Sequence, residues 1–194
     1  MNREGGGQIT YVCAMSVEER IAKRLGPTLR VGLGASRGIP AEGRRLVSFG
    51  IAGALRPGLE IGTVIDAIRV VDEQGAVLWE GPPLGIASAR PGTILGASRI
   101  IDHPDERARL QRTSGADAVD MESGPLARAG KLAGCIRAIS DTPDRGLAGL
   151  AKGAKLNGDV NYPGLLSGFL RSPLKTARAA RDARVALKQL EALA

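Results

Sequence analysis

Short runs of apolar and β-branched residues recur along the chain, separated by glycine-containing turns and by helix-like segments. Alternation of this kind predicts an α/β domain. The run RRLVSFGIAG at 44–53 is almost continuously apolar, which is typical of a strand buried on both faces of a sheet. A helix is expected at 16–25, and 116–134 reads as a strand end passing into a helix. The other expected strands are 8–15, 28–34, 62–72, 93–101 and 135–144.

Length and composition fit one globular domain spanning 1–194. The chain has 194 residues, of which 43% are hydrophobic and 24% charged. Cys13 and Cys135 each lie in an apolar run and are expected to be small core residues of a reduced protein. No run resembles a signal peptide or approaches the length of a spanning helix, so we expect a cytoplasmic protein. The stretch NGDVNYPG near 158–163 is expected to be a loop within the domain.

The formal net charge of +7 is compatible with a nucleic acid, an anionic membrane surface or an anionic substrate, and its distribution decides between them. Basic residues recur every three or four positions in a helix expected after Pro173: Lys175, Arg178, Arg181, Arg184 and Lys188. The expected apolar side consists of Leu174, Ala177, Val185, Leu187 and Leu190. Two interpretations of 173–194 stay open, a solvated basic face or a helix resting on anionic lipid at the periphery of the membrane. No nucleic-acid partner is expected.

A glycine-rich stretch, RVGLGASRGIP at 30–40, suggests a loop whose backbone amides approach a phosphate. The letters GASRGI match the cofactor turn of short-chain dehydrogenases. Pro40 stands where that family has glycine, however, and the apolar helix that should follow is missing. Neither Tyr11 nor Tyr162 is followed by a lysine four residues later, so a dehydrogenase is the disfavoured alternative.

Carboxylates gather where the expected strands end, which is the edge at which open α/β sheets bind ligands. Glu18, Glu122 and Asp141 are the candidates. A buried carboxyl that keeps its proton can protonate a leaving group while an ionised one activates water, the division of labour used to cleave glycosidic bonds. His103 is the only histidine and is expected in a loop or a helix cap, so metal catalysis and a Ser-His-Asp triad are disfavoured.

Five motifs then carry a resemblance that covers most of 8–145. They are CAMSVEE, SFGIAGALRPGLEIGTVI, GTILGASRII, AVDMES and RAISD, in this order. With them the chain resembles the nucleoside phosphorylase and nucleosidase family, and VDMES followed by RAISD is the specific part. The resemblance implies a three-layer α/β fold with a central mixed twisted sheet flanked by helices. It also implies an adenine nucleoside as substrate, no cofactor, and a homodimer or higher homo-oligomer.

Site roles follow from the resemblance residue by residue. Asp141 would be the general acid that protonates the five-membered ring of a leaving purine, with Ser140 beside it. Glu122 would accept hydrogen bonds from the ribose hydroxyls, and Met121 would pack on the sugar. Glu18 would activate the attacking water, as in the hydrolytic members.

The remaining binding positions are Ile100 and Ile101 beside the base, together with Ala52, Gly53 and Gly34. Two of the residues depart from the family pattern. Ile100 stands where the family stacks an aromatic ring, and Ile51 stands where some nucleosidases have a serine near the water. The first change implies that stacking on the base is weaker or is supplied by another group, and the second removes one hydroxyl near the attacking water.

The resemblance predicts a purine nucleosidase that releases adenine from an adenosyl compound. Phosphorolysis of the same bond is the alternative, with Arg37 and Gly34 as candidates to hold phosphate, while the presence of Glu18 favours hydrolysis. A protein that binds nucleosides or lipids without turnover is a third interpretation, against which the three retained carboxylates argue.

A narrower resemblance concerns the segment LLSGFLRSPLKTARAARDARVALKQL at 165–190. It is similar to the tail of hopanoid-associated members of the family, which release adenine from adenosylhopane. With a membrane-soluble substrate of that kind, the basic helix would serve to bind the protein to anionic lipid.

Overall fold

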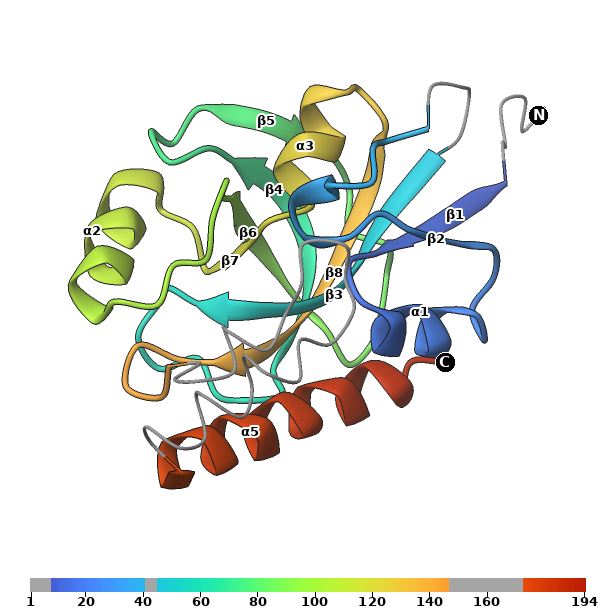
Figure 1. Cartoon of the computed structure of the whole chain (residues 1–194). Helices are drawn as coiled ribbons and strands as arrows, with labels where there is room; N and C mark the ends of the chain where they lie inside the picture. The colour runs from blue at the N-terminus through green and yellow to red at the C-terminus, as the bar shows by residue number, and fades with distance from the viewer. Residues whose placement is uncertain (1–7, 41–44, 147–172) are drawn as a thin grey trace.

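The computed structural model describes residues 8–40, 45–146 and 173–194, which form a sheet with helices on both sides (Figure 1). The helices are α1 (Ser16–Ala22), α2 (Pro104–Ser114), α3 (Ser123–Arg128) and α5 (Pro173–Glu191), with a 3-10 turn, η1, at Leu33–Ala35. The strands are β1 (Ile9–Cys13), β2 (Thr28–Arg30), β3 (Arg45–Ala54), β4 (Val64–Val71), β5 (Val77–Glu80), β6 (Arg90–Gly96), β7 (Ala118–Asp120) and β8 (Leu132–Asp141).

The sheet is mixed, as predicted, and its pairings close a ring. The strand order is β2-β1-β3-β7-β6-β4-β5, and β8 pairs with both β3 and β4. Strand β3 is parallel to β1 and β8 but antiparallel to β7. At its carboxyl end, Gly53 is in register with Val119 of β7 and with Asp141 of β8. The pairing therefore gathers the ends of three strands at one point.

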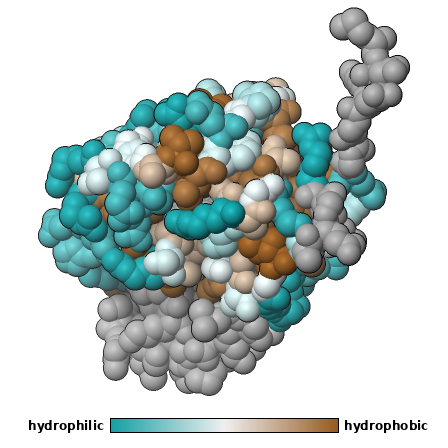
Figure 2. Space-filling view, turned by 90° about the horizontal axis from the view of Figure 1, so that it is seen from above, coloured by the Kyte–Doolittle hydropathy of each residue, from teal (hydrophilic) through white to brown (hydrophobic). Residues whose placement is uncertain are grey.

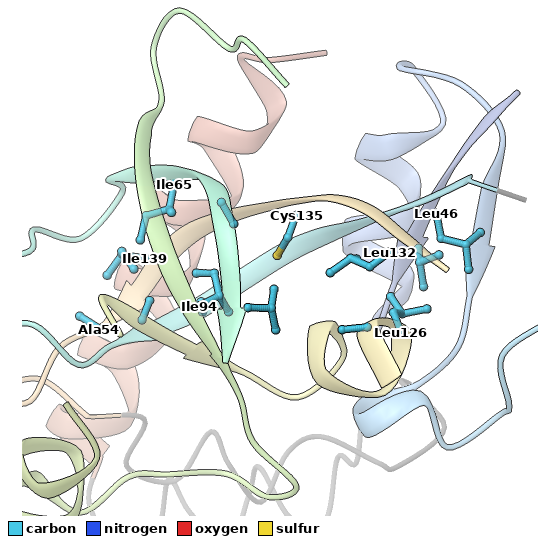
Figure 3. Packing of buried hydrophobic residues seen from close by; sticks show 14 of the residues in the cluster. Leu46, Ala54, Ile65, Ile94, Leu126, Leu132, Cys135 and Ile139 are labelled. Carbon is cyan, nitrogen blue, oxygen red and sulfur yellow. The ribbon is translucent and has the colours of Figure 1, made fainter. Parts of the chain in front are cut away.

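Hydrophobic clusters fill the space on both faces of the sheet. On one face, Ile21 of α1 and Leu190 of α5 pack with Phe49 of β3. On the other face, one cluster extends from Leu126 of α3 and Leu132 at one end to Ile139 of β8 at the other (Figure 3). Alternate residues of β3 point to opposite faces, and both faces are covered. This explains why the sequence of β3 is almost continuously apolar.

Helix α5 runs along one face of the sheet, below β3 and β8 (Figure 1). Its five predicted basic residues are all exposed. The predicted apolar side is partly wrong, because Leu174 is 85% exposed and Ala177 is also exposed. The buried residues are Thr176, Ala179, Asp182, Ala186 and Leu190. The inner face was hard to recognise because it contains a buried aspartate.

That aspartate, Asp182, explains how α5 is held against the end of β8. Arg145, in the turn after β8, donates from Nε to Asp182 Oδ2 at 3.0 Å and from Nη2 to Asp182 Oδ1 at 2.6 Å. A two-pronged arginine–carboxylate contact fixes both distance and orientation. The helix is therefore tied to the turn that follows Asp141.

Two elements were not predicted, β5 and α2. Pro104 in the first turn, Asp105 and Glu106 near the start and Gly115 in the left-handed conformation after the end are ordinary helix signals for α2. His103 is the N-cap residue of this helix, as expected of a cap. Helix α2 matters for the site because one of its side chains reaches the cavity.

The glycine-rich stretch at 30–40 forms the turn η1 instead of the start of a long helix. Gly34 and Gly38 have φ of 60° and 86°, a region in which other residues are strained. This geometry differs from the strand–turn–helix that a dinucleotide motif requires. The loop expected near 158–163 lies outside the described residues.

Both cysteines are free and buried, as expected. None of the helices in the described part of the chain is long and apolar enough to cross a membrane. On the face in Figure 2, hydrophobic side chains form separate patches between hydrophilic ones.

We predict that Leu190→Ala lowers the free energy of unfolding by about 2–5 kcal/mol, because Leu190 is fully buried under the sheet. Leu174→Ala, on the same helix, is the matched control and should change it by less than about 0.5 kcal/mol. Urea denaturation followed by circular dichroism measures both. Equal losses in the two variants would contradict the packing described for α5.

Candidate active site

A cavity lies where β3, β7 and β8 end, and the segment after β6 closes one side. Its lining combines apolar side chains with three carboxylates and two arginines: Ile51, Ala52, Gly53, Arg99, Ile100, Ile101, Arg107, Val119, Asp120, Met121, Glu122, Ser140 and Asp141. Eight of the positions predicted from the sequence line this one cavity: Ala52, Gly53, Ile100, Ile101, Met121, Glu122, Ser140 and Asp141. Three predicted positions, Glu18, Gly34 and Arg37, are not part of the wall.

One end of the cavity is formed by Asp141, which is the last residue of β8 and is buried. Ser140 Oγ lies 2.7 Å from Asp141 Oδ1 and 3.2 Å from the carbonyl oxygen of Ala52. The other carboxylate oxygen, Oδ2, accepts a hydrogen bond from Arg107 Nη2. One oxygen of Asp141 is therefore held by its neighbour Ser140 on β8 and the other by Arg107 on α2.

Arg107 was missed from the sequence because α2 was missed. Its side chain is only 1% exposed and extends from α2 to the cavity wall. Nε donates to the carbonyl oxygen of Ile101 at 2.9 Å, and Nη1 donates to that of Ala54 at 3.3 Å. The guanidinium is thus anchored at three points, and the third is Asp141.

The other carboxylate end is organised by a second buried arginine, Arg137, which was also missed. Its Nε donates to Asp120 Oδ2 at 2.7 Å, and its Nη2 donates to Ser48 Oγ at 2.6 Å. The same Nη2 lies 3.4 Å from Glu122 Oε2. Arg137 is the first residue of the motif RAISD and lies in an apolar run that was predicted to be a buried strand. Nothing in such a run indicates that the arginine is buried and binds the carboxylates of the site.

Glu122 lies two residues after β7, at the N-cap of α3, and lines the cavity. The amide of Gly34 donates to Glu122 Oε1 at 3.0 Å, so the glycine-rich loop touches the site through this carboxylate. Burial raises the pKa of Glu122 to about 8, although Arg137 acts in the opposite direction. Because this pKa is close to neutral pH, a charged ligand bound beside Glu122 can change the protonation state of its carboxyl group.

Glu18 lies behind the cavity wall, in the first turn of α1. Its Oε2 accepts from the amides of Ala14 and Met15 at 3.1 and 2.9 Å, and its Oε1 accepts from the amide of Ile51 at 3.0 Å. A Cβ at Gly50 would lie 2.4 Å from Glu18 Oε1, so only glycine leaves room for this carboxylate. Burial raises the pKa of Glu18, while Arg137 and the amide hydrogen bonds oppose the shift.

Arg37 is exposed, and the structure does not bring it into the cavity wall. Gly34 reaches the site only through Glu122 and through Met121, whose Cε would lie 3.7 Å from a Cβ at Gly34. The glycine-rich loop therefore supports the carboxylate of Glu122 in this structure.

The cavity wall combines the ion pair of Asp141 and Arg107 and the carboxylate of Glu122 with apolar residues such as Ile51, Ile100 and Met121. A ligand that fits has both hydrogen-bonding groups and apolar surface. Carboxylates in such a wall can bind hydroxyl or amino groups and stabilise positive charge that develops beside them.

We predict that Arg137→Met lowers the free energy of unfolding by about 3–5 kcal/mol, because it leaves buried carboxylates without their counter-charge. Arg69→Met removes an exposed ion pair with Glu80 and should cost at most about 1 kcal/mol. Thermal and urea unfolding of the two variants provide the comparison. An Arg137 variant as stable as the Arg69 control would show that the buried network does not hold the fold.

No protein-family model and no curated protein sequence matches the chain. Solved structures do match over nearly the whole chain. The 5′-methylthioadenosine/S-adenosylhomocysteine nucleosidase of Helicobacter pylori has a TM-score of 0.60 at 16% identity, covering 98% of each chain. The futalosine hydrolase of H. pylori strain 26695 has a TM-score of 0.58 at 15% identity, covering 96% of this chain and 97% of its own.

The S-adenosylhomocysteine nucleosidase from Streptococcus pyogenes has a TM-score of 0.57 at 16% identity, and both chains are covered completely. At this identity the likeness establishes the fold. The mixed sheet, its flanking helices and these three structures agree with the architecture predicted from the sequence. The chain therefore has the fold of the nucleoside phosphorylase and nucleosidase family.

Proposed function

We propose that this protein is a purine nucleosidase that hydrolyses the N-glycosidic bond of an adenosyl compound and releases adenine. The observation that carries the proposal is that Glu122 and Asp141 line one cavity together with apolar residues, and that each carboxylate is held by its own buried arginine. The nucleosidase fold supports the same activity.

Glu122 binds the ribose in this proposal. When Glu122 is ionised, its carboxylate accepts hydrogen bonds from the sugar hydroxyls, and Met121 packs on the ring. As the glycosidic bond breaks, the sugar acquires oxocarbenium character, and a nearby carboxylate stabilises that positive charge. The hydrogen bonds from Gly34 and Arg137 hold the carboxylate in place for this role.

Glu18 is the proposed base. It takes a proton from water while the water oxygen bonds to C1′ and the C1′–N9 bond breaks with its electron pair on the purine. Asp141, with Ser140 beside it, faces the base as the candidate acid. Glu18 Oε1 is bonded to the amide of Ile51, which lines the cavity, so the proposal requires the carboxylate to exchange this amide for water.

Hydrolysis is favoured over phosphorolysis by the location of the cations. Arg37, the candidate for holding phosphate, lies away from the cavity wall. Two arginines line the cavity on the proposed base side: Arg99 precedes Ile100 in the chain, and Arg107 extends from α2 and donates to the carbonyl oxygen of Ile101. Phosphorolysis stays the alternative and is distinguished by its sugar phosphate product.

The finer proposal for the substrate is an adenosyl lipid such as adenosylhopane, with the protein cytoplasmic and at the membrane periphery. The exposed basic face of α5 supports contact with anionic lipid. A homodimer or higher homo-oligomer is proposed from the family resemblance.

We predict adenine release from at least one adenine nucleoside in a panel that includes an adenosyl lipid, with or without phosphate. Glu18→Gln and Asp141→Asn should each lower turnover by at least about 100-fold, because the first removes the base that activates water and the second removes the carboxylate that faces the purine. Glu80→Gln, on an exposed strand, is the matched control and should retain full activity. Chromatography of the free base measures all three. No base from any substrate, at any protein concentration, would refute the proposal.

The pH dependence gives a separate prediction. Burial raises the pKa of Glu18 above its ordinary value of 4.5. Glu18 should therefore lose its proton, and become able to act as a base, at a higher pH than an exposed glutamate. Turnover should therefore fall as the pH is lowered through a value above 4.5. A pH profile of kcat tests this, and a rate that stays constant down to pH 4.5 would contradict the role of Glu18.

A further inference from the structure

The base-facing end of the cavity contains two charged groups side by side. Arg107 and Asp141 are both buried, both line the cavity, and are joined through Nη2 and Oδ2. The expectation from the resemblance concerned Asp141 alone. Arg107 changes the chemistry of this end because a guanidinium can only donate hydrogen bonds, whereas an ionised carboxylate can only accept them.

The hydrogen-bonding capacity of Arg107 is only partly used. A guanidinium carries five N–H groups, and the hydrogen bonds to Ile101, Ala54 and Asp141 use one each on Nε, Nη1 and Nη2. One N–H on Nη1 and one on Nη2 are left over among the hydrogen bonds of the described residues. Asp102 Oδ1 is 3.9 Å from Nη2, which is beyond hydrogen-bond length.

The backbone keeps this pair accessible from the cavity. A Cβ at Gly53 would lie 2.8 Å from Asp141 Oδ2 and 3.1 Å from Arg107 Nη2. Any larger residue there would displace the pair or cover it. Because Gly53 itself lines the cavity, the missing side chain leaves room beside both charged groups.

A donor beside an acceptor complements one edge of adenine. On that edge the 6-amino group donates and the neighbouring N7 accepts, whereas a 6-oxopurine presents two acceptors. We propose that Arg107 determines specificity at this site by donating a hydrogen bond to N7 while Asp141 accepts one from the 6-amino group. A 6-oxopurine would place its oxygen against the Asp141 carboxylate and is selected against. This inference rests on the proposed function and deepens it.

The proposal also changes how the base leaves. When the C1′–N9 bond breaks, both electrons go to the purine, and the hydrogen bond from Arg107 to N7 stabilises the resulting negative charge. The water that attacks C1′ gives its proton to Glu18, the purine takes a proton from solvent water, and the hydroxide formed there takes the proton back from Glu18. Asp141 transfers no proton in this step; it holds Arg107 and accepts the hydrogen bond from the amino group.

Paired ligands test the assignment. Calorimetry would compare the binding of 5′-methylthioadenosine, under conditions without turnover, with that of its 7-deaza analogue, which has carbon in place of N7. The unaltered protein should prefer the N7 compound by about tenfold or more, the size of a hydrogen bond to a charged group. In Arg107→Met the two ligands should bind equally, because the donor that senses N7 is gone.

Arg109→Met is the matched control, since Arg109 is on the same helix with its side chain 55% exposed, and it should keep the full preference. If Arg107→Met still preferred the N7 compound as strongly as the unaltered protein, the inference would be overturned. The hydrogen bond to N7 would then be assigned to a protonated Asp141. If Arg107→Met does not fold, a measurement on the unaltered protein still tests the inference. That protein should bind the matching 6-oxopurine nucleoside at least about tenfold more weakly than the adenine nucleoside, and equal binding would overturn the inference. Failure of base release from every nucleoside would instead refute the proposed function.

Discussion

A guanidinium buried among carboxylates is the interaction on which the rest of the site depends. Arg137 is 1% exposed, and it contacts Asp120, Ser48 and Glu122, which come from different parts of the sheet. A charge in this position is tolerated only because its partners surround it. The network fixes where β7 and β8 stand relative to β3, and it thereby sets the position of Glu122 at the cavity.

The second buried arginine organises the other end. Arg107 comes from a helix on the opposite side of β7, yet it reaches Asp141 at the end of β8. The two arginines divide the carboxylates of the site between them, so Glu122 and Asp141 are held at separate positions. In the proposed function, Glu122 binds the ribose and Asp141 faces the base.

Much of the fold could be predicted because apolar runs and glycine turns are local signals. β3, β4 and β8 were predicted close to their observed positions, and eight of the expected site residues line one cavity. What failed depends on contacts between distant residues. Arg107 and Arg137 can be buried because carboxylates from other elements bind them. Asp182 can face inward because Arg145 binds its carboxylate. Charged residues in a sequence suggest exposure, and nothing local in it reveals such partners.

Hydrolysis at C1′ is the central claim, and isotope labelling tests it most directly. The reaction would be run in water enriched in oxygen-18 with phosphate present, and the sugar product would be analysed by mass spectrometry. We predict that the label appears once in the sugar, bound to C1′, together with an equal amount of free adenine. A sugar phosphate without the label would contradict the claim and assign the same cavity to phosphorolysis.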